Sequence, residues 1–106
     1  MSTEHTATDL TPIQLLGAHL RQTRLRAGLS VPGAVAAAGQ AAGMVLHCGD
    51  PRRARGVSRP FVYMIEAGTR RPSGETLATL LHVYGATAEE TDRATRLHDS
   101  CAVLAL

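Results

Sequence analysis

Apolar residues recur three and four positions apart along most of the chain, and short segments rich in glycine, proline, serine and threonine separate these runs. Such spacing places the apolar side chains on one face of a helix. No pair of segments has the alternating pattern of a strand pair. The sequence therefore predicts an all-α fold of five short helices, opened by these residues: Thr11, Ser30, Ser58, Ser73 and Thr87.

Each predicted helix has a start signal, and most have a stop signal. Thr11 is followed by Pro12 in the first turn and by Gln14, which completes a capping box. Thr87 and Glu90 form a second box. Glycines follow three of the apolar runs, where a residue of positive φ ends a helix; they are Gly28, Gly68 and Gly85.

The second predicted helix runs from Val31 to Ala38, and residues 40–56 follow a different pattern. Their apolar run, Met44 to Leu46, is consistent with a strand, a helix end or a contact surface. A turn signal follows at Gly49 to Pro51. We treat 40–56 as a segment apart from the helical pattern.

The last predicted helix, residues 87–106, has an apolar face made of Ala94, Leu97, Cys101 and Leu104. The helix is more apolar than a lone terminal helix needs, so we expect a homodimer contact through Leu97, Cys101, Leu104 and Leu106. The alternative is that the helix covers the core of its own chain.

The length of 106 residues and the 44% hydrophobic content are typical of one globular domain. We expect residues 1–10 to be a flexible arm and 11–106 to be the domain. No apolar run is long enough to span a bilayer, and the polar start of the chain lacks an export signal, so we expect a cytoplasmic protein without membrane contact.

Charge is distributed unevenly along the chain. Residues 21–71 hold nine arginines against Asp50 and Glu66, a net charge of +7, whereas the whole chain carries only +2. A basic middle between acidic ends indicates a surface that faces a polyanion. The alternative is that some of these arginines pair with the acidic C-terminal part.

Three blocks of residues together resemble the lambda-repressor-like helix-turn-helix family, also called the Cro/cI or XRE type. They are Leu16 to Arg24 with Gly28-Leu29-Ser30, then Gly56 to Arg59 with Ile65 to Gly68, and last Arg70 to Ser73 with Leu80 to Gly85. The resemblance covers about residues 14–88 and implies a five-helix DNA-binding domain. The chain departs from the family at 40–56, which is an insertion in the turn between the second and third helices. Either it loops outward, or it lengthens the second helix and re-aims the third.

In the family, the third helix lies in the major groove and touches base edges. Carried over to this chain, helix 58–67 is the reading helix, and Arg59 is suited to a bidentate contact with guanine worth about 1–3 kcal/mol. The alternative is that Phe61 and Met64 belong to the core and Arg59 is solvated. The residues expected to contact bases are Arg59, Pro60, Phe61, Tyr63 and Met64.

Phosphates are bound by cations and by backbone amides at helix starts. The candidates are Ser30, Arg52, Arg53, Arg55, Ser58, Arg70 and Arg71. For the three arginines of the insertion, the alternative is a solvated loop. The resemblance also implies a structural ion pair between Arg24 and Glu66.

The sequence predicts a sequence-specific transcriptional regulator that binds double-stranded DNA. The alternative is a protein-interaction module, antitoxin-like or an adaptor, that binds a protein partner through 40–56. No catalytic motif is present, so we expect neither an enzyme nor a cofactor. A zinc site built from His47, Cys48, His98 and Cys101 is disfavoured, because adjacent ligands chelate poorly, and we expect no metal.

Overall fold

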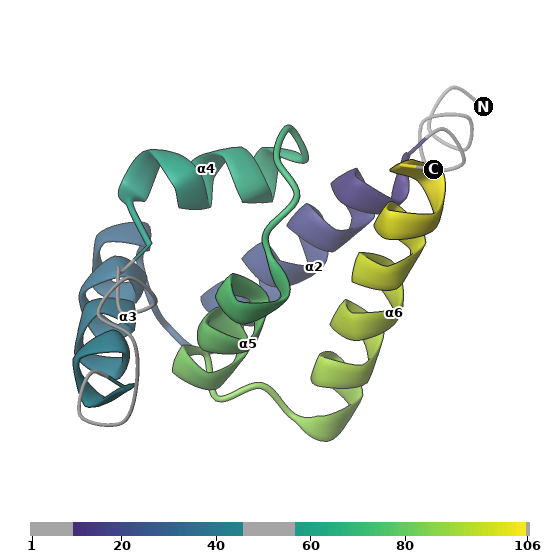
Figure 1. Cartoon of the computed structure of the whole chain (residues 1–106). Helices are drawn as coiled ribbons and strands as arrows, with labels where there is room; N and C mark the ends of the chain where they lie inside the picture. Colours follow the sequence, from purple (N-terminus) through teal and green to yellow (C-terminus); the bar gives the residue numbers. More distant parts are fainter. Residues whose placement is uncertain (1–9, 46–56, 106) are drawn as a thin grey trace.

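The computed structural model describes residues 10–45 and 57–105, and within these ranges it contains helices and no strand (Figure 1). The all-α fold predicted from the sequence is confirmed. The described residues form five helices: α2 (Pro12–Arg26), α3 (Val31–Val45), α4 (Arg59–Ala67), α5 (Gly74–Val83) and α6 (Ala88–Ala105).

The predicted helix starts are confirmed by their capping hydrogen bonds. The Thr11 hydroxyl accepts from the Gln14 amide at 3.3 Å, and the Gln14 side-chain oxygen accepts from the Thr11 amide at 3.0 Å. Thr87 and Glu90 form the equivalent pair of bonds, at 3.1 and 2.9 Å. The serine side chains at the starts of α3, α4 and α5 each accept from an amide three residues ahead.

Helix α3 is longer than the sequence pattern predicts, because it continues past Ala38 to Val45. Alanine, the best helix former, stands on both sides of Gly39, at 36–38 and at 41–42, and offsets the cost of Gly39 and Gly43 within the helix. Residues 40–45 of the predicted insertion are thus a continuation of the second helix, and Met44 and Val45 lie at a helix end. Residues 46–56, which include Gly49, Asp50 and Gly56, lie outside the described residues.

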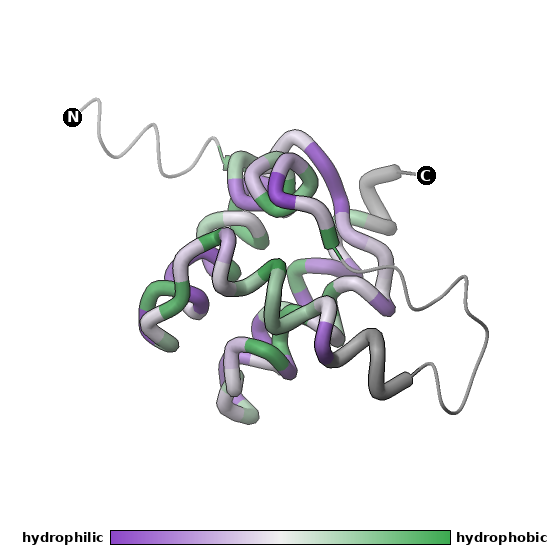
Figure 2. The backbone as a smooth tube through the Cα atoms, turned by 90° about the vertical axis from the view of Figure 1, so that its left-hand side faces the viewer, coloured by the Kyte–Doolittle hydropathy of each residue, from purple (hydrophilic) through white to green (hydrophobic). Residues whose placement is uncertain are grey.

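Helix α2 lies at the centre of the packing, with α4 against one side and α6 against another. Hydrophobic and hydrophilic residues alternate along much of the coloured tube in Figure 2, as expected where helices are amphipathic. Leu16 and Leu20 of α2 are fully buried, and they share one core cluster with Val62 and Ile65 of α4 and with Leu80 of α5.

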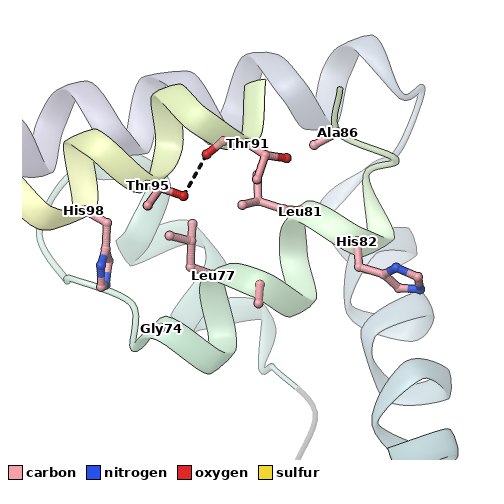
Figure 3. Close-up of a pocket in the computed structure, with 9 residues that line it drawn as sticks. Gly74, Leu77, Leu81, His82, Ala86, Thr91, Thr95 and His98 are labelled. Carbon is pink, nitrogen blue, oxygen red and sulfur yellow. Dashed lines mark hydrogen bonds between the residues drawn. The ribbon is translucent and has the colours of Figure 1, made fainter. Parts of the chain in front are cut away.

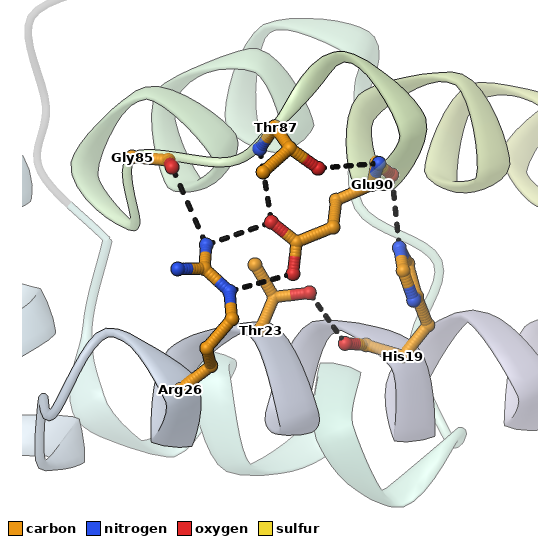
Figure 4. Close-up of polar contacts among 6 residues, drawn as sticks. All are labelled: His19, Thr23, Arg26, Gly85, Thr87 and Glu90. Atoms are coloured by element: carbon orange, nitrogen blue, oxygen red, sulfur yellow. Dashed lines mark hydrogen bonds and ion pairs between the residues drawn. The ribbon is translucent and has the colours of Figure 1, made fainter.

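Helix α6 packs against its own chain. Ala94 and Cys101 are buried in the core cluster, and Leu97 is partly buried against it. Where α2 meets the start of α6, the Arg26 guanidinium holds the Glu90 carboxylate through two bonds of 2.7 and 2.8 Å (Figure 4). Two residues of the predicted dimer contact, Leu97 and Cys101, are therefore used within the chain, and the homodimer stays a prediction.

Candidate nucleic-acid interface

Helix α4 begins and ends at well-defined signals. Ser58 caps its first turn, Pro60 occupies the second helical position, and Gly68 ends the helix in the left-handed conformation at φ 77°. Val62 and Ile65 point into the core. The side chains on the other side of this short helix are therefore left for solvent or a ligand.

Four of the five residues expected to contact bases are exposed. Arg59 and Pro60 are exposed at the start of α4, and Tyr63 and Met64 follow with 56% and 39% of their surface accessible. These four lie on one short helix, within about one and a half turns. All four side chains are therefore accessible to a ligand. Met64 is exposed and does not belong to the core.

Phe61 is placed differently from the other four. It is half-buried, packs against the core cluster, and lies under the Arg70 guanidinium, 5.3 Å from the ring centroid. This corresponds to the alternative considered for Phe61, a core residue. The contact also holds Arg70, an exposed residue of the loop after α4, beside the start of that helix.

A bidentate ion pair ties α4 to α2. The Arg24 Nε and Nη2 donate to the two carboxylate oxygens of Glu66 at 2.8 and 3.0 Å, and Nη1 donates to the Leu29 carbonyl at 2.8 Å. Both side chains are nearly buried, with 9% and 8% exposed. The hydrogen bond to Glu66 raises the pKa of Arg24 above its ordinary value. The pair is the one that the family resemblance implies, and it ties the last turn of α4 to α2.

Two glycines let α4 approach α2 closely, a role that the local sequence pattern does not predict. A Cβ on Gly17 would stand 2.4 Å from the Ile65 carbonyl oxygen, and a Cβ on Gly68 would stand 2.7 Å from the Gln14 Cα. The only sequence signal for Gly17 was a glycine in the middle of a predicted helix, which is costly unless close packing requires it.

The phosphate candidates are in several different settings. The Ser30 and Ser58 hydroxyls serve as caps, so only backbone amides of those helix starts are free for an anion. Arg71 reaches α6, where its Nη2 lies 3.4 Å from the His98 Nδ1 and 3.5 Å from the His98 carbonyl oxygen. Arg52, Arg53 and Arg55 lie outside the described residues.

A separate groove of about 410 Å³ lies between α5 and α6 (Figure 3). Leu77 and Leu81 line one wall, and Thr91, Thr95 and His98 line the other. The His98 Nε2 donates to the Pro72 carbonyl at 2.8 Å, which joins α6 to the loop ahead of α5. No α4 residue lines this groove.

The four candidate zinc ligands do not form a metal site in the described part of the chain. His47 and Cys48 lie outside it, and among the described residues no three potential ligands of the His, Cys, Asp and Glu types come together. Cys101 is buried, and burial raises the pKa of its thiol. No described helix is long and apolar enough to cross a membrane.

A family model described as a helix-turn-helix domain matches residues 15–94, which extend from α2 into the first half of α6. Searches of curated proteins and of solved structures returned no match. The matched range contains α4, its ion pair with α2, and all of the candidate contact residues.

Proposed function

Because this chain belongs to the helix-turn-helix domain family, we propose that it is a sequence-specific DNA-binding transcriptional regulator that reads the major groove with α4. One observation supports this most directly. Pro60, Tyr63 and Met64 are exposed opposite the buried face of α4, and Arg59 is exposed at its first position. Arg24 and Glu66 hold this helix in place.

We assign base reading to Arg59 first. It stands at the first position of α4, where side chains of a reading helix meet base edges, and its guanidinium matches the two acceptors of guanine. Pro60, Tyr63 and Met64 follow it along the same accessible surface. Phe61 supports this surface from the core side, beneath Arg70.

We assign phosphate binding to the cations and the helix N-termini around α4. Arg70 is exposed beside the start of the helix. The starts of α3 and α4 leave the Val31 and Arg59 amides for an anion, because Pro32 and Pro60 have no N–H and the third amide of each helix donates to the capping serine. Arg71 joins this set when it leaves His98, and Arg52, Arg53 and Arg55 supply further cations from the insertion.

The proposal includes a homodimer, formed through residues 87–106, that binds two half-sites. We place the protein in the cytoplasm and assign it no catalytic reaction. The dimer is tested separately from DNA binding, by sedimentation of the free protein across a concentration series.

The test is duplex binding from a random-sequence library over a salt series, with Arg59→Ala beside the wild type. We expect enrichment of a defined sequence, a steep negative salt slope, and a loss of affinity of about 5- to 150-fold in Arg59→Ala. Arg70→Ala should weaken all sequences alike and reduce the salt slope by about one. Arg96→Ala, an exposed arginine of α6 paired with Asp92, is the matched control and should change little.

A protein-interaction module, antitoxin-like or an adaptor, is the second candidate. It is favoured by the accessible apolar surface of Tyr63 and Met64, which also suits a protein partner. Absence of duplex binding at low salt would contradict the regulator and leave this candidate, with α4 and 40–56 as the surfaces to search for a partner.

A further inference from the structure

The exposed face of α4 is a continuous apolar stripe. Pro60, Tyr63, Met64 and Ala67 are all exposed and lie at positions i, i+3, i+4 and i+7, which is one face of a helix. We call these four residues the outward stripe. The opposite face, with Val62 and Ile65, is buried, so the outward stripe is not needed for the core.

The outward stripe is poor in groups that can read bases by hydrogen bonding. On the accessible side of α4, only the Arg59 guanidinium and the Tyr63 hydroxyl carry such groups, and no asparagine or glutamine is present on the helix. The Glu66 carboxylate already accepts two bonds from Arg24. Hydrogen-bond readout by α4 is therefore concentrated on Arg59, and most of the surface is apolar.

The charges around the outward stripe favour a polyanion as its partner. Arg59 precedes it and Arg70 is held beside the same helix over Phe61, and both are exposed. Glu66 is the only acid of α4, and its charge is balanced by Arg24 within the protein. A protein groove that bound this apolar surface would have to supply compensating acids, whereas duplex DNA supplies phosphates on both sides of its groove.

The major groove presents one apolar group, the methyl on C5 of a pyrimidine. We propose that the outward stripe reads pyrimidine C5-methyl groups next to a guanine bound by Arg59; this inference rests on the proposed function. From Pro60 to Ala67 the helix advances about 10 Å, so the methyl groups lie within roughly three base-pair steps of that guanine. Thymine and 5-methylcytosine carry the same methyl group, and both fit this chemistry.

The experiment measures how much a single methyl group on the DNA contributes to affinity. The duplex selected from a random library is remade with deoxyuridine in place of thymidine, one position at a time, within the bases beside the guanine. This change removes only the methyl and keeps every base pair. Burial of one such carbon accounts for about a fourfold change in affinity, so we expect Kd to rise by about fourfold at each contacted position. At the same positions, cytosine and 5-methylcytosine are then compared opposite guanine, and the methylated form should bind more tightly.

A variant of the outward stripe shows whether α4 makes the contact. In Met64→Ala the penalty for at least one deoxyuridine substitution should shrink towards zero, because the side chain that touches that methyl is gone. Leu25→Ala is the matched control, since Leu25 is 55% exposed on α2 and its loss should leave the deoxyuridine penalty unchanged. Circular dichroism of both variants checks that the helices are intact.

The possible outcomes distinguish a failure of the methyl readout from a failure of the proposed DNA-binding function. A selected duplex whose affinity is unchanged by every deoxyuridine substitution overturns the methyl readout and leaves the DNA-binding function standing. A deoxyuridine penalty that is the same in Met64→Ala, Tyr63→Ala and the wild type also overturns it. If no duplex is selected at low salt, the proposed function fails and this inference fails with it, and the outward stripe is then a surface for a protein.

Discussion

Gly17 in the middle of α2 lies against the Ile65 carbonyl oxygen of α4, so closely that a Cβ on Gly17 would stand 2.4 Å from that oxygen and 2.7 Å from the Glu66 carbonyl oxygen. Real Cβ atoms do not approach backbone oxygens this closely, and neither neighbour is a flexible side-chain end. The two helices therefore touch through backbone at this point, and the position of α4 relative to α2 depends on the missing side chain.

Gly17→Ala should consequently destabilise the protein, although alanine is the better helix former. We expect the overpacking to exceed the gain in helix propensity and to lower the free energy of unfolding by about 1–3 kcal/mol in urea titration. Gly39→Ala is the matched control, because Gly39 is also helical, has ordinary φ and has no neighbour within 4 Å of an added Cβ. There the same substitution should add about 0.5–1 kcal/mol. Equal gains at both positions would contradict the backbone contact.

The Arg24–Glu66 pair should contribute far more to stability than the Arg26–Glu90 pair. Removing one partner of a nearly buried pair leaves an uncompensated charge, so Arg24→Ala is expected to cost about 3–5 kcal/mol. The Arg26 side chain is half exposed, and Arg26→Ala should cost at most about 1 kcal/mol. Thermal and urea denaturation of the two variants give the comparison. Similar losses of stability in the two variants would show that burial does not determine how much each ion pair contributes.

Glu90 makes the stability of the fold depend on acid pH. Two bonds from Arg26 and the Thr87 amide lower the pKa of Glu90 from an ordinary value of 4.5 to about 2. The folded state therefore holds the proton less tightly than the unfolded state. The resulting stabilisation is present above pH 4.5 and is lost as the pH falls towards 2. We expect the Tm difference between the wild type and Glu90→Gln to narrow as the pH falls from 4.5 to 2. A constant Tm difference would show that the pKa of Glu90 is not lowered in the folded state.

The Tyr84 hydroxyl is buried without a hydrogen-bond partner among the described residues. Burial raises the pKa of this phenol to about 12, since the charged form is the one that desolvation disfavours. Tyr84→Phe keeps the ring and removes the unsatisfied group, so stability should be unchanged or higher by about 1 kcal/mol. A loss above 1 kcal/mol in urea titration would mean that the hydroxyl has a bond in solution.

The helix starts could be predicted because each depends on residues close together in the sequence. The Thr11 and Thr87 boxes are formed over three residues, and the structure confirms both. The end of α3 could not be predicted in this way. Gly39 is usually a sign of a break, but the alanines around it continue the helix to Val45.

In the candidate site too, some features could be predicted from the sequence and others depend on contacts between distant residues. The resemblance to the family places α4 and the Arg24–Glu66 pair, and the structure contains both. It does not separate Phe61, which packs against the core, from Met64, which is exposed, because both are apolar residues of one short helix. The role of Gly17 depends on how α4 crosses α2, a contact between residues far apart in the chain.

Helix α4 keeps the residues that anchor it apart from the residues that face outward. Val62, Ile65 and Glu66 hold the helix, and the outward stripe shares none of them. Exposed positions tolerate substitution with small changes in stability, typically within about 0.5 kcal/mol. Substitutions in the outward stripe can therefore change the surface that α4 presents while the scaffold stays the same. For engineering, the outward stripe is a set of positions that can be randomised to obtain α4 helices with different outward surfaces on one stable fold.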